Sequence, residues 1–134
     1  MAIFDALSIS GSGMTAHRKW LDAVSDNISN INDVAATSED AFKERFVDVQ
    51  ANEYGSGEGG VRVAGVTFGS GEGRMVYEPD HPLADKDGYV KYPDIDLGDQ
   101  MTELMIAQRG YQANVTAITR ATDAYQAALR LGKG

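Results

Sequence analysis

Apolar residues in the last third of the chain recur at alternating steps of four and three residues. The pattern lasts more than four heptads, and eight of its ten positions are apolar or aromatic. A stripe this narrow is typical of a coiled-coil seam and predicts a helix over residues 97–131, about 52 Å long. Pro93 precedes the helix, Asp96 and Asp99 supply an N-cap and a first-turn carboxylate, and Gly132 ends it. The ten positions are Leu97, Met101, Leu104, Gln108, Tyr111, Val115, Ile118, Thr122, Tyr125 and Leu129.

A weaker stripe with the same period lies at the start of the chain. Its apolar members are Ile3, Leu7, Met14, Leu21, Val24, Ile28 and Ile31. Gly11 and Gly13 are expected to loosen this helix near residue 12, and a cluster of asparagines after residue 26 is expected to end it. Gly110, within the other helix, costs about 1 kcal/mol relative to alanine. One explanation for a glycine there is the close approach of a neighbouring helix.

Between the two stripes the sequence predicts short strands and one mobile segment. Residues 33–60 hold nine charges and few large apolar side chains, which favours a mobile loop, with a short strand or helical turn around Phe46 as the alternative. Asp85–Gly88 is a strong hairpin signal. Three or four short strands are expected to form one small antiparallel sheet. The strand-like runs are residues 61–63, 66–68, 74–77 and 89–92.

These elements predict an α+β fold. Long N- and C-terminal helices form a coiled-coil-like hairpin, and a small antiparallel β domain is inserted between them. We divide the chain into an N-terminal helix (1–32), an acidic flexible segment (33–60), a small β domain (61–95) and a C-terminal helix (96–134) that pairs with residues 1–32.

Composition indicates that the chain completes its apolar core against other chains. Leu, Ile, Val and Phe make up 28 of 134 residues, about 21%, which is low for a compact domain of this size. Twelve basic and twenty acidic side chains give a formal charge of −8, and residues 33–60 alone carry −5. So acidic a chain is a poor candidate for binding nucleic acid. The two ends of the chain are close to neutral.

Several other classes are excluded by what the sequence lacks. It has no cysteine, which excludes disulfides, zinc knuckles, iron–sulfur clusters and thiol catalysis. No run approaches 18 consecutive apolar residues, so we expect no membrane insertion. The first residues lack a basic segment followed by an apolar one, so we expect no cleaved secretory signal.

Two motifs could indicate a ligand-binding site, but for each a structural role is the favoured interpretation. Gly55–Gly60 fits G-x-G-x-x-G, but a β-type run follows it where a dinucleotide site needs a helix, and Glu58 would repel a pyrophosphate. A flexible connector is favoured. The carboxylates between residues 80 and 96 could suggest calcium. With Gly88 in the glycine slot of an EF-hand, however, Leu83 would take the first ligand position, so turn chemistry is favoured.

The remaining polar candidates have no partners at an interpretable spacing. His17 and His81 lack a second histidine or a serine arranged for metal binding or nucleophilic catalysis, and Glu103 lacks a paired carboxylate. We therefore predict no catalytic, cofactor-binding or metal-binding residues, and no enzyme. A small hydrolase or metal-binding protein is kept only as a third option, dependent on Asp85, Asp87 or His81.

Several motifs together resemble those of bacterial flagellar axial proteins, in particular the rod proteins of the basal body. Ile3–Ser10 and Asp26–Asn30 are similar to the amino-terminal motif of that family, and Gln108–Val115 is similar to its carboxyl-terminal signature. Val61–Val66 and Val76–Val90 resemble the middle of one member. The segment after Asn30 departs from the family pattern of Asn-Thr-x-Thr.

The resemblance implies a structural subunit of a hollow, torque-transmitting proximal rod in the periplasm. It implies export by the flagellar type III apparatus, terminal helices as an inner layer and a small outer β domain. Expected partners are copies of the chain, neighbouring rod subunits, the protein that joins the rod to the MS ring and other hook–basal-body proteins. No cofactor is expected.

The two seams are the predicted assembly interface. The carboxyl-terminal seam is expected to pack partly on the amino-terminal one, and neighbouring subunits are expected to bury the rest. Repetition of such contacts around a screw axis extends into a tube, whereas a soluble coiled-coil adaptor or closed homo-oligomer would stop at a fixed number of copies. The predicted interface residues are Leu7, Met14, Leu21, Val24, Ile28, Met101, Leu104, Gln108, Tyr111, Val115, Ile118, Tyr125 and Leu129.

Overall fold

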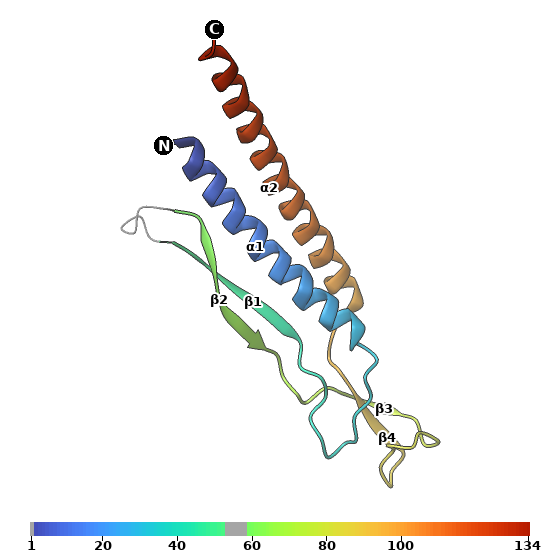
Figure 1. The fold of residues 1–134 in the computed structure, drawn as a ribbon. Coiled ribbons are helices and arrows are strands. Elements are labelled where there is room, and N and C mark those ends of the chain that lie inside the picture. Colours follow the sequence, from blue (N-terminus) through green and yellow to red (C-terminus); the bar gives the residue numbers. More distant parts are fainter. Residues whose placement is uncertain (1, 53–58) are drawn as a thin grey trace. The chain divides into compact units, whose positions relative to one another are not determined.

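The computed structural model describes residues 2–52 and 59–134 and confirms an α+β fold (Figure 1). Residues 53–58, which include most of the glycine-rich run at 55–60, lie outside the described residues. Two long helices flank two antiparallel β-hairpins. The elements in chain order are α1 (Ala2–Ser29), β1 (Arg45–Ala51), β2 (Val61–Phe68), β3 (Arg74–Tyr77), β4 (Tyr89–Tyr92) and α2 (Leu97–Leu131).

Helix α2 has the bounds that the heptad pattern predicts. Pro93 is buried just before it, and the Asp96 carboxylate accepts a hydrogen bond of 2.9 Å from the backbone N–H of Asp99. This is the N-cap interaction that leaves fewer free N–H groups in the first turn. At the other end, Arg130 lies in the last turn, and the N–H of Gly132 donates to the carbonyl of Ala128 at 3.0 Å.

Helix α1 is continuous, and the predicted loosening near residue 12 is wrong. Ala2–Ser29 is helical through both Gly11 and Gly13. Gly13 is buried, so tertiary packing outweighs the weak helix propensity of glycine there. The helix ends where the asparagine cluster predicts, and the Asn30 side chain donates to the carbonyl of Asp26 at 2.8 Å.

The β region differs from prediction in its pairing. Instead of one sheet of three or four strands, β1 pairs with β2, and β3 pairs with β4. The runs at 61–63 and 66–68 form the single strand β2. Its partner β1 lies inside residues 33–60, where the sequence favours a mobile loop. Alternate residues of β1 are half-buried at its start (Arg45 and Val47), and the rest of the strand is exposed.

The second hairpin is formed as predicted. β3 and β4 are antiparallel, with Val76 opposite Val90, and Val90 is fully buried. The turn before β4 depends on Asp85, whose carboxylate accepts from the N–H groups of Asp87 and Tyr89 at 2.9 and 3.0 Å. Gly88 has a φ of 85°, in the left-handed region that favours glycine. Turn chemistry therefore accounts for Asp85.

The chain divides into two compact units, which we treat separately. The first unit comprises Met1–Leu21, Asp48–Gly65 and Met105–Gly134, and the second comprises Asp22–Val47 and Val66–Leu104. Both cores are small, as the composition predicts. Ala16 and Ala107 are buried in the first unit, whereas the second buries Ala23, Val24, Ala41, Val90 and Ile95. Within the described residues, no helix is both long and apolar enough to cross a membrane.

Candidate assembly surface

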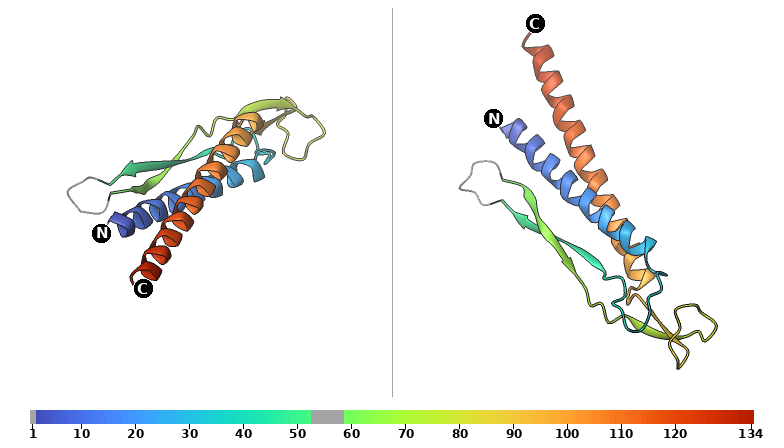
Figure 2. Two further views of the ribbon diagram at one scale, coloured as in Figure 1. Left: turned by 90° about the horizontal axis from the view of Figure 1, so that it is seen from above. Right: turned by 60° about the horizontal axis from the view of Figure 1, so that its bottom comes forward.

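Small residues and polar side chains make the helix–helix contact of the first unit, in which α1 and α2 are antiparallel (Figures 1 and 2). A Cβ atom built on Gly110 would lie 2.1 Å from Nε2 of His17, and one built on Gly13 would lie 2.8 Å from Oδ1 of Asn114. Ala107, on the same side of α2, is fully buried. The close approach that Gly110 suggests in the sequence is therefore present, and its partner is the α1 helix of the same chain.

Two hydrogen bonds fix the side chains at this contact. Nδ1 of His17 lies 2.7 Å from the carbonyl oxygen of Gly13 and donates to it, and the Asn114 amide donates to the carbonyl of Gly110 at 2.9 Å. Nearer the ends of the helices, Phe4 and Tyr125 meet edge to face with 5.7 Å between ring centroids. His17 is thus a packing residue of this helix contact.

The predicted interface residues of α1 are mostly covered within the single chain. Val24 is buried with 1% of its surface exposed. The other four are half-buried, namely Leu7, Met14, Leu21 and Ile28. Met14 lines a hollow together with Tyr111 of α2.

The predicted interface residues of α2 are mostly accessible. Three of them are half-buried, namely Leu104, Tyr111 and Ile118. Five are exposed, namely Met101, Gln108, Val115, Tyr125 and Leu129. The face of α2 that touches α1 is displaced from the heptad seam toward Ala107, Gly110 and Asn114, because small residues allow a closer approach than leucine or methionine does.

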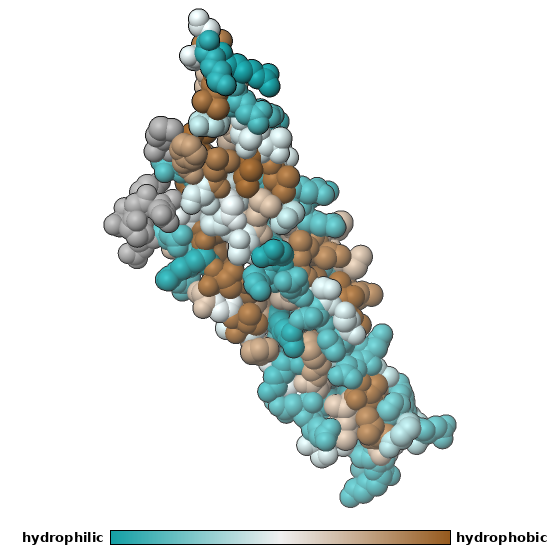
Figure 3. Space-filling view, viewed as in Figure 1, coloured by the Kyte–Doolittle hydropathy of each residue, from teal (hydrophilic) through white to brown (hydrophobic). Residues whose placement is uncertain are grey.

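The apolar surface left open on α2 is larger than the seam alone. Met105 and Ile106 are each 51% exposed, and Leu131 is 84% exposed, although none of the three belongs to the heptad frame. Apolar side chains gather on the visible face over the helical part of the first unit (brown in Figure 3). Adjoining exposed apolar residues of this kind mark an interaction surface. The interface residues predicted from the sequence do not include these three, because that set follows a single heptad register.

A buried amide pair in the second unit was also missed. Asn27 and Gln100 are each 1% exposed, and the Asn27 amide donates to Oε1 of Gln100 at 3.0 Å. Asn27 also exchanges hydrogen bonds with the backbone of Arg45, accepting at 2.8 Å and donating at 3.0 Å. Gln100 in turn donates to the Glu44 carboxylate at 2.6 Å. The network ties α1 and α2 to the start of β1.

The electrostatics around Glu44 follow from its position in this network. Burial raises the pKa of the Glu44 carboxyl above its usual value, and the nearby carboxylates of Glu103, Asp99 and Asp94 raise it further, against the opposing effect of the Gln100 hydrogen bond. Next to it, Arg45 forms an ion pair with Asp26 and lies over the Phe42 ring. The neighbouring acids make this part of the second unit strongly negative.

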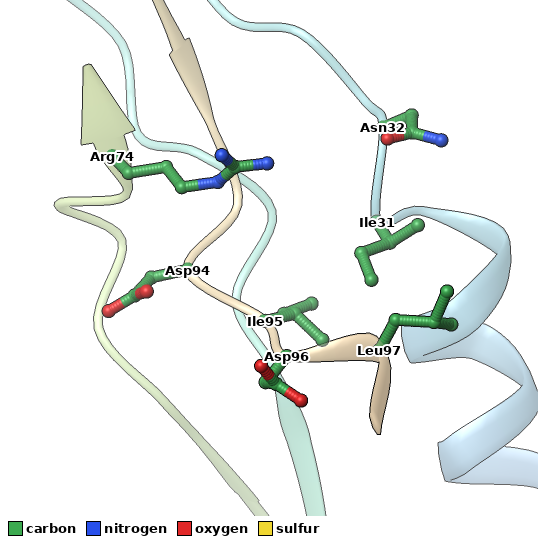
Figure 4. A pocket seen from close by; sticks show the side chains of 7 residues that line it. All are labelled: Ile31, Asn32, Arg74, Asp94, Ile95, Asp96 and Leu97. Atoms are coloured by element: carbon green, nitrogen blue, oxygen red, sulfur yellow. The ribbon is translucent and has the colours of Figure 1, made fainter. Parts of the chain in front are cut away.

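A hollow of about 490 Å³ lies beside the start of α2 (Figure 4). Ile31, Ile95 and Leu97 point toward one another on one side of it, and Arg74 extends toward it from β3. Its remaining lining residues are Asn32, Asp94 and Asp96. The guanidinium of Arg74 lies over the Tyr92 ring, 5.4 Å from its centroid. The lining is suited to a partner that presents both apolar and charged groups.

The other polar candidates serve local structure. His81 accepts a hydrogen bond from the N–H of Leu83 at 3.1 Å, and Asp85 accepts one from the Thr37 hydroxyl at 3.1 Å. Over residues 2–52 and 59–134, no three histidine or acidic side chains are grouped in a way that could hold a metal ion. The exposed apolar surface of α2 is therefore the leading candidate for a functional site.

Comparisons with known proteins give matches over nearly the whole chain. Residues 86–131 match the family described as Flagellar basal body rod FlgEFG protein C-terminal. The chain is 35% identical over 134 residues to the flagellar basal-body rod protein FlgC of Escherichia coli, covering 99% of this chain and 100% of that protein. Identity to the proteins of the same name is 34% over 134 residues in Salmonella typhimurium and 31% over 150 residues in Bacillus subtilis, again covering 99% of this chain and all of each relative.

Proposed function

This chain belongs to the FlgC family of flagellar basal-body rod proteins, and on that premise we propose that it is a structural, non-enzymatic subunit of the basal-body rod. The observation that carries the proposal is the end-to-end similarity to relatives of that name, at 35% identity over 134 residues. A local motif could be shared with unrelated proteins, whereas a match over both helices and the β region involves the whole architecture.

We further propose that the rod forms by self-association of the terminal helices into a hollow, torque-transmitting tube. The exposed apolar side chains of α2 support this, because a lone chain leaves them in water. Burial of about 1,000 Å² of apolar surface per subunit would contribute roughly 25 kcal/mol before the costs of ordering and association. The interface predicted from the two seams, and the four-part division of the chain, remain predictions.

The remaining elements of the proposal concern location and partners. The chain is placed in the part of the rod that crosses the periplasm, after export through the flagellar type III apparatus without removal of a signal segment. Its neighbours would be copies of itself, other rod subunits and the protein that joins the rod to the MS ring. No cofactor, nucleic acid or membrane insertion enters this role.

The role can be tested in a motile bacterium that carries this chain. Deleting its gene should abolish swimming, and basal bodies isolated from the deletion strain should lack a complete rod. Reintroducing the full chain on a plasmid should restore both, and mass spectrometry should then detect the chain in purified basal bodies. Complete rods and normal swimming in the deletion strain would overturn the proposal. A chain that sediments as one closed oligomer and never enters basal bodies would favour the adaptor alternative.

A further inference from the structure

Charge is divided very unevenly between the two units. The first unit holds seven basic and five acidic side chains, a formal charge of +2. The second holds five basic and fifteen acidic side chains, a formal charge of −10. Two copies that meet through like units repel each other, whereas contact between the first unit of one copy and the second unit of another is attractive.

The second unit offers a concave feature for such a contact. The hollow beside the start of α2 combines the apolar side chains of Ile31, Ile95 and Leu97 with the carboxylates of Asp94 and Asp96 (Figure 4). Both carboxylates are exposed at the surface. Arg74 is the one cation among the lining residues, and its guanidinium is held over the Tyr92 ring.

The first unit offers a convex feature of matching chemistry, the α2 tip, which we define as residues 129–133. Leu129 is 49% and Leu131 is 84% exposed, and Arg130 and Lys133 are exposed between and beyond them. The tip therefore presents two cations and two leucines together. Side chains of this composition complement a hollow lined by isoleucine, leucine and aspartate.

A chain cannot fill its own hollow with its own tip. Leu97 lines the hollow and begins α2, whereas Leu131 ends the same helix of 35 residues. At 1.5 Å per residue the two ends are separated by about 50 Å. The tip that occupies the hollow must come from a second copy.

We propose that the α2 tip of one copy docks into the Ile31–Ile95–Leu97 hollow of a second copy, with Arg130 or Lys133 beside Asp94 and Asp96. The contact rests on the proposed role as a rod subunit. It specifies that the partner is a second copy of the chain and which surface of each copy takes part. It uses two different surfaces of the chain, so each copy keeps one free tip and one free hollow. Such a heterologous contact allows addition of further copies instead of closing as a dimer.

Disulfide trapping tests the contact, and the native chain has no cysteine to interfere. The full-length double variant L97C/L131C, expressed in place of the native chain, should give disulfide-linked dimers and larger species in isolated basal bodies under mild oxidation. Each single variant alone should give none, because the contact joins unlike positions. A disulfide requires Cα atoms within about 7 Å, so the signal is specific to direct docking.

The matched control is L83C/L131C. Leu83 lies in the second unit and is 44% exposed, close to the 51% of Leu97, but it does not line the hollow. Equal cross-linking of both double variants would overturn the inference, and so would a chain that enters basal bodies but forms no 97–131 bond. Absence of the chain from basal bodies would instead contradict the proposed function, so the two failures can be told apart.

A charge exchange in the same cross-linking background gives a second test. R130E should lower the yield of the 97–131 bond about fivefold, and adding D94K should restore most of it, because the ion pair is re-formed with opposite polarity. R120E is the control on the same helix and should leave the yield unchanged. Loss with R130E but no recovery with D94K would contradict pairing across this hollow.

Discussion

At the scale of single residues, Gly110 and His17 determine how closely the two helices of the first unit approach. The α2 backbone at Gly110 lies against the imidazole of His17, and that ring is held by its hydrogen bond to Gly13. No side chain larger than hydrogen fits there without movement of the ring or of the helix. Helix propensity would favour a larger residue than glycine at position 110, whereas packing against His17 requires glycine. A Cβ at position 110 would lie only 2.1 Å from Nε2 of His17, so packing decides the residue here.

We expect G110A to destabilise the chain by about 1–2 kcal/mol, because overpacking outweighs the gain of about 1 kcal/mol in helix propensity. The measurement is urea unfolding of the full chain followed by circular dichroism. G11A is the matched control. Among residues 2–52 and 59–134, no atom beyond the neighbouring residues and the local helix backbone lies within 4 Å of a Cβ built on Gly11, so that change should stabilise the helix. A G110A chain as stable as the native one would contradict the clash with His17, whereas recovery in H17A/G110A would support it.

Glu44 gives a residue-scale prediction about pH. The pKa of the Glu44 carboxyl is raised in the folded chain above its usual value of 4.5. At pH values between 4.5 and the raised pKa, the carboxyl therefore binds more protons in the folded state than in the unfolded state. Its contribution to stability is therefore most favourable below this window and declines as the pH rises through it. E44Q keeps the acceptor for Gln100 and removes the charge.

E44Q should therefore raise stability at neutral pH, by no more than about 1 kcal/mol because Glu44 is only half-buried, and should have little effect near pH 4.5. Urea unfolding at a series of pH values would measure the difference between variant and native chain. E72Q, at an exposed carboxylate of the same unit, is the control. A difference that does not change with pH would contradict the origin assigned to the shift.

At the scale of elements, α2 uses two faces for two purposes. The face with Ala107, Gly110 and Asn114 meets α1, and the neighbouring face leaves Val115 and Leu129 in water. One helix thus packs against the rest of its own chain and leaves apolar surface exposed, which in the proposed function contacts other copies. A substitution on the open face should affect association without affecting folding.

V115K should leave the free energy of unfolding within about 0.5 kcal/mol of the native value, because Val115 is exposed, yet it should sharply reduce recovery of the chain in purified basal bodies. Quantitative mass spectrometry of those basal bodies is the readout. Q112K places the same charge at another exposed position of α2, outside the seam, and should be incorporated normally. Equal incorporation of both variants would contradict a role for the seam in assembly.

Elements with strong periodicity or strong turn chemistry could be predicted from the sequence. Helix α2 and strands β3 and β4 have the expected bounds, because heptad spacing, the Asp96 cap and the Asp85–Gly88 turn act locally. Strand β1 was indicated only by the alternative of a short strand around Phe46, and the favoured mobile loop is wrong there, because the pairing of β1 with β2 depends on a segment distant in sequence.

The helix contact and the buried amides were harder to predict for a related reason. Asn27 in isolation indicates a turn, and it becomes a core residue only because Gln100 and the Arg45 backbone satisfy its hydrogen bonds. Likewise, hydrophobic periodicity identifies the apolar seam of α2, but it does not show that glycine and alanine form the inner face. Glycine carries no hydrophobic signal and alanine only a weak one, although both permit a closer approach of helices than larger residues do.

At the scale of the whole chain, the charge difference between the units gives a prediction about association. The first unit is positive and the second strongly negative, so attraction between unlike units should be screened by salt. Raising NaCl from about 50 mM to about 500 mM should weaken self-association of the purified chain, as measured by analytical ultracentrifugation. An equal osmolarity of sucrose serves as the control. Stronger association in salt would indicate that apolar burial alone drives it.

The glycine–histidine contact of the first unit also bears on the dimensions of any assembled cylinder. Helices joined by small residues have their axes closer together than helices joined by leucines, so each pair occupies less of the circumference. A wall built from such closely packed pairs would be thinner than a wall of the same number of helices packed through leucines. In the proposed tube, such a wall would leave a wider bore for a given outer diameter.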